Sequence, residues 1–183
     1  MKERDYFITK RERPMYERYD KAVEEGNTEE LKWFEMFNKG KWESQMIRNA
    51  VEYEQYLRCG YQGQPTFDEY GWLDNGRCAE LKKKAEEIQV FMKEQYYAVV
   101  MLLQHPNGTW IATTSYMLPQ SGGGSYPNIW CTPYPTRREA LNAALDSLIS
   151  WIGSCTAKSD RSFLEEVRKM RCNTAQTSLF DLF

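Results

Sequence analysis

The uneven distribution of charged residues is the feature that most constrains this chain. Residues 96–152 contain four charged side chains, whereas the segments on both sides are dense in Lys, Arg, Asp and Glu. A stretch so poor in charge is typical of the packed centre of a protein, because an unpaired charge is costly to bury. The sequence therefore predicts a hydrophobic core built on residues 96–152, with amphipathic helices in the flanks.

Two runs inside this segment have the composition of buried β-strands. Tyr96–Leu103 and Thr109–Leu118 are rich in aromatic and β-branched residues, which favour strands, and the residues 105–108 between them are typical of a turn. A third, short strand is expected at Ile129–Cys131. The three glycines at 122–124 are expected in a loop, and no Gly-Lys-Ser/Thr follows them to hold a phosphate.

Both flanks carry apolar residues at helical spacing. The sequence predicts helices between Pro14 and Gly26, Asn27 and Gly40, Trp42 and Gly60, Arg77 and Gln95, Thr136 and Gly153, and Ser159 and Arg171. Residues 60–76 are rich in glycine and are expected to form a loop. Beyond Asn173 a mobile tail is expected.

These elements predict an α+β fold, in which a small antiparallel β-meander of two or three strands packs with several amphipathic helices. Strands and helices do not alternate as they do in a parallel sheet. We expect a helical N-terminal region at 1–95, a β-β-β-α core at 96–152, and a C-terminal helix with a flexible tail at 153–183. Together these parts are expected to form one globular domain.

Composition excludes several classes of protein. With 42% hydrophobic and 14% aromatic residues, the chain has too much apolar surface for an intrinsically disordered protein. A net charge of -2 gives no overall attraction to nucleic acid. No apolar run approaches the roughly 18 residues of a membrane span, and the first residues lack the apolar core of a signal peptide. We therefore expect a cytoplasmic protein without a membrane partner.

Residues that commonly carry catalysis are sparse. The 5 Cys are widely spaced and form no C-x-x-C pair, which favours packed thiols over a disulfide framework or a zinc site. His105, the only histidine, is expected to be a solvated turn residue. Asp68, Glu69 and Asp74 are explained equally well as turn and capping residues. The sequence therefore predicts no catalytic residue, no metal ligand and no cofactor, and it favours a protein that is not an enzyme.

The order of the elements expected over 77–152, helix, three strands and helix, resembles the double-stranded RNA-binding domain. That family begins its second helix with a lysine cluster that spans RNA phosphates, and here two arginines followed by Glu139 occupy that place. A triple lysine on the first expected helix adds a basic cluster, which a solvated helix face also explains. The resemblance implies a nucleic-acid-binding module, with the candidate residues Lys82, Lys83, Lys84, Arg137 and Arg138.

Near the C-terminus, the segment Gln176-Thr177-Ser178-Leu179-Phe180 resembles the peptide by which bacterial DNA polymerases, repair proteins and some phage or plasmid proteins bind the sliding clamp. That family has Gln, a variable residue that is commonly Leu, Ser or Asp, Leu and Phe. The resemblance implies that Gln176 forms hydrogen bonds at the edge of the clamp's groove. Leu179 and Phe180 would fill an apolar pocket, and Ser178 would help to set the bend between them.

Three functional hypotheses follow. The first is a non-enzymatic accessory protein of bacterial, phage or mobile-element type, which its C-terminal segment tethers to the replication clamp while its body engages another protein or DNA. The second is the nucleic-acid-binding module, and the third is a hydrolase or nuclease whose carboxylates the fold brings together. For the first hypothesis an alternative stays open, because Leu179, Phe180, Leu182 and Phe183 could instead pack on the protein's own surface.

Overall fold

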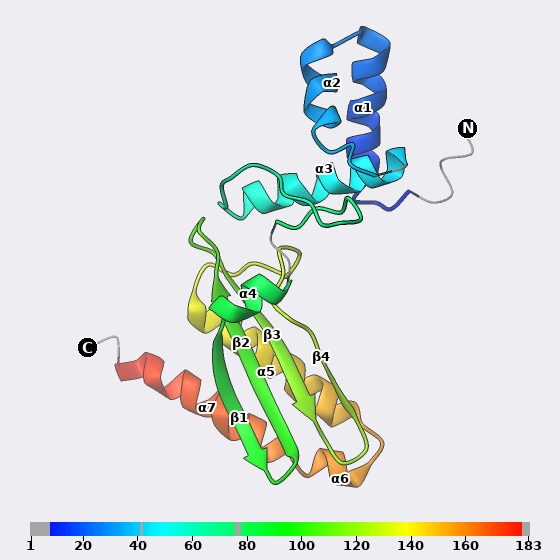
Figure 1. Ribbon diagram of the computed structural model, residues 1–183. Helices are drawn as coiled ribbons and strands as arrows, with labels where there is room; N and C mark the ends of the chain where they lie inside the picture. Colours follow the sequence, from blue (N-terminus) through cyan, green and yellow to red (C-terminus); the bar gives the residue numbers. More distant parts are fainter. Residues whose placement is uncertain (1–7, 41, 76–77, 181–183) are drawn as a thin grey trace. The chain divides into compact units, whose positions relative to one another are not determined.

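The computed structural model describes residues 8–40, 42–75 and 78–180, and the chain forms two compact units (Figure 1). The N-terminal unit ends at Asn75 and the C-terminal unit begins at Gly76. The sequence predicts one globular domain whose helical region extends to residue 95. The structural boundary lies earlier than this, because the first strand of the sheet begins before residue 96.

In the described part of the N-terminal unit, the helices are α1 (Arg13–Glu25), α2 (Thr28–Glu35) and α3 (Glu43–Arg58). Gly26 ends α1 with a φ of 64°, in the left-handed region that favours glycine. The Asn27 side chain begins α2 by accepting a hydrogen bond from Glu30 N–H at 3.1 Å. The helices pack around Phe34, Phe37 and Ile47, which are fully buried.

The C-terminal unit contains an antiparallel meander in the order β1-β2-β3-β4. Its first elements are α4 (Cys78–Lys84), β1 (Glu86–Lys93), β2 (Tyr96–Gln104), β3 (Trp110–Met117) and β4 (Gly122–Gly124). This arrangement confirms the predicted α+β fold with an antiparallel sheet. The sheet has four strands, whereas the sequence predicts two or three.

Three local predictions for the sheet are wrong. Residues 77–95 do not form one helix, because 86–93 pair with β2 as an edge strand. Met92, which the predicted helix would bury, is 57% exposed. Ile129–Cys131 lies in a turn rather than a strand, and the glycines at 122–124, predicted as a loop, pair with β3 instead.

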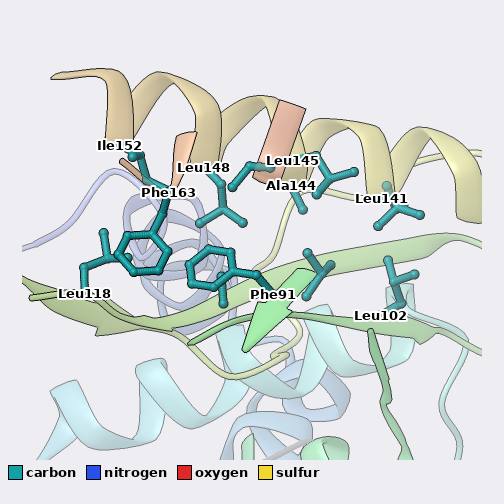
Figure 2. Close-up of a cluster of buried hydrophobic side chains, with 13 residues drawn as sticks. Phe91, Leu102, Leu118, Leu141, Ala144, Leu145, Leu148, Ile152 and Phe163 are labelled. Atoms are coloured by element: carbon teal, nitrogen blue, oxygen red, sulfur yellow. The ribbon is translucent and has the colours of Figure 1, made fainter. Parts of the chain in front are cut away.

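The remaining helices are α5 (Arg137–Ser154), α6 (Lys158–Arg161) and α7 (Leu164–Phe180). The predicted capping box at the start of α5 is confirmed, since Glu139 N–H donates to Thr136 Oγ1 at 3.2 Å and the Glu139 carboxylate accepts from Thr136 N–H. Figure 2 shows that the leucines of α5 point onto the sheet. There the ring of Phe91 stacks on Phe163 with a distance of 4.9 Å between the ring centres.

The second face of the sheet is covered over only part of its length. Towards α4, which lies across this face (Figure 1), Met101, Leu103 and Ile111 are buried. At the opposite end of the strands, Met92 and Met117 are 57% and 46% exposed. Since strand side chains alternate between the two faces, this face combines a buried half with an open apolar half.

His105 departs from its predicted environment. The sequence places it in a solvated turn, but the residue is 3% exposed, and its main-chain N–H donates to Thr109 O at 2.8 Å at the end of β2. The solvated turn consists of the next three residues, 106–108, of which Gly108 adopts a φ of 89°. Burial lowers the pKa of the imidazole, because desolvation disfavours its charged form.

This shift predicts a loss of stability in acid. The pKa of this histidine is lower in the folded state than in the unfolded state, where it is 6.5. At a pH above 6.5 the imidazole is neutral in both states, so its titration does not reduce the free energy of unfolding. As the pH falls below 6.5, the unfolded state binds the proton more readily, so the free energy of unfolding should decrease. Because the chain has one histidine, a nuclear magnetic resonance titration of the imidazole should give a single pKa below 6.5.

The variant His105→Gln provides the control for this prediction. It should lose the part of the acid destabilisation that begins just below pH 6.5 while keeping any part that carboxylates cause at lower pH. An imidazole pKa at or above 6.5 in the folded protein would contradict the prediction.

Candidate functional site

The C-terminal segment extends from a helix that is firmly attached to its unit. Val167 of α7 is fully buried in the core. Further along, the Arg171 guanidinium binds the Asp146 carboxylate of α5 with N–O distances of 2.8 and 3.2 Å. The Thr174 hydroxyl lies 2.9 Å from Asn142 Oδ1 on the same helix. The α5–α7 contact therefore fixes α7 as far as Thr174.

The backbone beyond this attachment differs from the predicted tail. The sequence predicts irregular chain after Asn173, but α7 continues to Phe180, and its last turns extend past the edge of the sheet (Figure 1). The side chains of the clamp-like residues Gln176, Ser178, Leu179 and Phe180 lie outside the described part of the structure, as do residues 181–183. The candidate peptide therefore lies at the end of a helix whose first part is anchored.

The predicted nucleic-acid-binding residues occupy two helices. Lys82, Lys83 and Lys84 lie at the end of α4, and Arg137 and Arg138 lie in the first turn of α5. These helices cover opposite faces of the sheet (Figure 1). Arg137 nevertheless contacts Glu86 at the start of β1, two residues after Lys84, so the two clusters approach each other at this end of the sheet.

Several of these cations also have partners within the unit. The Arg137 guanidinium forms two hydrogen bonds to the Glu86 carboxylate, at 2.9 and 2.5 Å, which lower the pKa of Glu86. Lys83 Nζ lies 2.6 Å from Glu80 Oε1. These ion pairs reduce the charge that the clusters offer to phosphate, and nucleic-acid binding stays a prediction.

Lys82 makes a different contact. Its Nζ lies 4.3 Å from the centre of the Tyr126 ring, within the range of a cation–π interaction. Tyr126 is 50% exposed and follows β4, so the pair links α4 to the loop after the last strand. Lys84 and Arg138 are exposed.

Of the carboxylates that the sequence singles out, that of Asp68 is engaged in loop structure. Asp68 Oδ1 accepts hydrogen bonds from Tyr70 N–H at 2.9 Å and from Trp72 N–H at 2.8 Å, the pattern of a turn-forming aspartate. Among the described residues, no group of three or more His, Cys, Asp or Glu side chains is placed to hold a metal ion. The hydrolase or nuclease hypothesis therefore gains no support from this region.

Asp160 of α6 is a buried carboxylate that the sequence analysis missed. It is 1% exposed, and it accepts hydrogen bonds from Gln120 N–H at 2.9 Å and from Ser121 Oγ at 2.5 Å. The contact joins the loop before β4 to α6. The two hydrogen bonds compensate for burying the carboxyl group. No local pattern signals it, because the partners are 39 and 40 positions away in the sequence.

A cavity of about 330 Å³ lies in the C-terminal unit beside β3 and α5. It is bordered by Ala112 and Thr114 of β3, by the residues 130–132 and Tyr134 that precede α5, and by Ala144 and Ser147 of α5. None of the residues that border it is charged. The sequence analysis did not identify this site, because its walls come from segments that only the fold brings together.

The described helices include none that is long and apolar enough to cross a membrane.

Comparisons with models of protein families, with curated proteins and with solved structures found no match to this chain.

Proposed function

We propose that this protein is a non-enzymatic accessory protein that binds the sliding clamp of DNA replication through residues 176–180. The observation that carries the proposal is the sequence Gln-Thr-Ser-Leu-Phe in this segment, at the end of a helix that is anchored to its unit as far as Thr174. A segment in this position is suited to reach a groove on another protein while the rest of the unit keeps its packing.

The helical backbone of the segment is compatible with capture by a clamp. A helix loses its terminal residues at low cost, since each one gives up a single backbone hydrogen bond and no new nucleus has to form. Docking in a bent conformation would therefore unwind the last turns of α7 without disturbing Val167 or the Arg171–Asp146 pair. Burial of Leu179 and Phe180 in an apolar pocket supplies the favourable free energy, at about 2 kcal/mol or more for each anchor side chain.

Titration calorimetry of the full-length protein against a purified bacterial sliding clamp tests the proposal. We expect the wild type to bind and the double variant Leu179→Ala/Phe180→Ala to bind about 100-fold more weakly or not at all, because two anchor residues are lost. Thr177→Leu should bind more tightly than the wild type, since leucine is the common residue at this position of the clamp-binding peptide.

A matched control uses apolar side chains that are exposed elsewhere. The double variant Met92→Ala/Met117→Ala removes two side chains that are 57% and 46% exposed on the sheet, and it should bind the clamp like the wild type. Equal binding by the wild type and by Leu179→Ala/Phe180→Ala, or no binding by the wild type, would refute the proposal.

A further inference from the structure

The outer edge of β3 is paired at two separate places. At its start, Trp110 N–H donates to Tyr134 O at 2.8 Å, and Tyr134 N–H donates to Trp110 O at 2.7 Å. Further along, Thr114 O accepts from Ser125 N–H at 3.0 Å, and the rest of β3 pairs with β4. The chain between Ser125 and Tyr134 leaves the edge of the sheet and returns to it.

Ala112 lies midway between these two places. In an antiparallel ladder the N–H and C=O groups of alternate residues point to the same side. Since Trp110 and Thr114 bond along the outer edge, the N–H and C=O of Ala112 point to that edge as well. Neither group has a hydrogen-bond partner among the described residues, so β3 presents one donor and one acceptor side by side.

The cavity of about 330 Å³ lies against this part of β3. The residues that border it and bear hydroxyl groups are Thr113, Thr114, Ser125, Thr132, Tyr134 and Ser147. Thr113 is 6% exposed, and its Oγ1 has no hydrogen-bond partner among the described residues. A buried polar group without a partner is uncommon in folded proteins. Because strand side chains alternate, the Thr113 hydroxyl belongs to the opposite face of the sheet from Ala112, so the unpaired feature at the cavity is the main chain of Ala112.

The boundaries of the cavity limit what fits into it. A passing strand would collide with the Tyr134 pair at one end and with Ser125 at the other, since residues 110 and 114 are separated by only about 13 Å of extended chain. The ligand is therefore compact. It is also neutral, because the lining has no charged side chain to balance a phosphate or a carboxylate.

We propose that this cavity binds a nucleobase, whose ring pairs with the N–H and C=O of Ala112. Nucleobases carry a hydrogen-bond donor next to an acceptor on one edge, which matches the main-chain pattern of one strand residue. The aromatic residues Trp130 and Tyr134 border the same cavity and provide surfaces against which a planar ring can pack. The volume is at the lower end of the range for small-molecule sites.

The base can come from a free nucleoside or from a single-stranded oligonucleotide. Titrations of the full-length protein with uridine, adenosine and a short single-stranded DNA distinguish these sources, with chemical shifts of the backbone amides as the measurement. We expect saturable binding of at least one nucleoside and a downfield shift of the Ala112 amide proton on binding. If only the oligonucleotide binds, the base comes from nucleic acid, and the proposal that the cavity holds a nucleobase still stands.

Two variants of α5 make the test specific. Ala143→Leu/Ser147→Leu adds bulk at two positions that border the cavity, neither of which is fully buried, and it should weaken binding at least tenfold. Ser150→Leu makes the same kind of change at an exposed position of α5 outside the cavity, and it should bind like the wild type. Circular dichroism melting confirms that both variants fold.

Three results of these titrations would overturn the inference, and a fourth would come from a different probe. The three are no binding of nucleosides or oligonucleotide, an Ala112 amide that does not move at saturation, or equal binding by Ala143→Leu/Ser147→Leu and Ser150→Leu. Binding of a blocked amino-acid amide in place of nucleosides would also overturn it, since that result would assign the site to a peptide.

Discussion

Replacing Asn49 with alanine is expected to destabilise the N-terminal unit by about 3–5 kcal/mol, since an unsatisfied buried polar group costs roughly 1–3 kcal/mol. Asn49 in α3 has no solvent exposure. Its Nδ2 donates to Gly71 O at 2.8 Å and to Phe37 O at 3.3 Å, and its Oδ1 accepts from Leu73 N–H at 2.9 Å. The substitution would leave these three main-chain groups without a hydrogen-bond partner. The site is buried, so bulk water does not replace the lost bonds.

The measurement is hydrogen exchange of the full-length protein, followed at the amides of α2 and α3. Asn49→Ala should accelerate exchange at these amides by two orders of magnitude or more, since about 1.4 kcal/mol corresponds to a factor of ten. Asn38→Ala is the matched control, because Asn38 is exposed and its side chain bonds only weakly to Glu35 at 3.3 and 3.4 Å. Equal exchange in the two variants would show that the buried network does not stabilise the unit.

Asn49 also illustrates what the sequence analysis does not reach. The apolar residues of α3, such as Met46 and Ala50, follow the helical spacing that predicts the helix, and both are buried. A buried asparagine lies on the same stripe and breaks no pattern. Its partners are 12 or more positions away in the sequence, and two of them, Gly71 and Leu73, are in a loop more than twenty positions away. Spacing predicts which face is buried, but it does not predict which polar groups meet there.

Two of the errors in the sheet, at residues 86–93 and at the glycines 122–124, have different physical causes. Residues 86–93 carry apolar side chains whose spacing is compatible with a helix and with a strand, and pairing with β2 decides between them. The glycines of β4 have low strand propensity, yet the strand requires a glycine at position 124. A Cβ at position 124 would lie 2.8 Å from Ser115 Cα and from Thr114 O, so only glycine allows the close approach to β3.

The two candidate sites differ in how far the sequence alone reveals them. The clamp-like segment is contiguous, so its residues are visible in the sequence without any fold. The cavity depends on the main chain of Ala112, whose neighbours at the edge of the sheet, Ser125 and Tyr134, come from either end of a loop. A main-chain donor and acceptor have no sequence signature, because every residue other than proline carries them.

Replacing Leu145 with alanine is expected to destabilise the C-terminal unit by about 3–4 kcal/mol, within the range of roughly 2–5 kcal/mol for buried leucines. Leu145 is fully buried, between Leu141 and Leu148 on the face of α5 that meets the sheet (Figure 2). Truncation removes its contacts and leaves a void, which the regular packing of helix on sheet cannot close without moving α5.

Hydrogen exchange at the amides of β2 and β3 measures this effect, because these strands lie beneath α5. The matched control is Leu57→Ala, which makes the same change at a leucine that is 43% exposed and should cost less than about 1 kcal/mol. If Leu145→Ala left the exchange of β2 and β3 within threefold of the wild type, α5 would not be packed on the sheet as described. The walls that α5 contributes to the nucleobase cavity would then also be in doubt, since Ala144 lies next to Leu145 and borders that cavity.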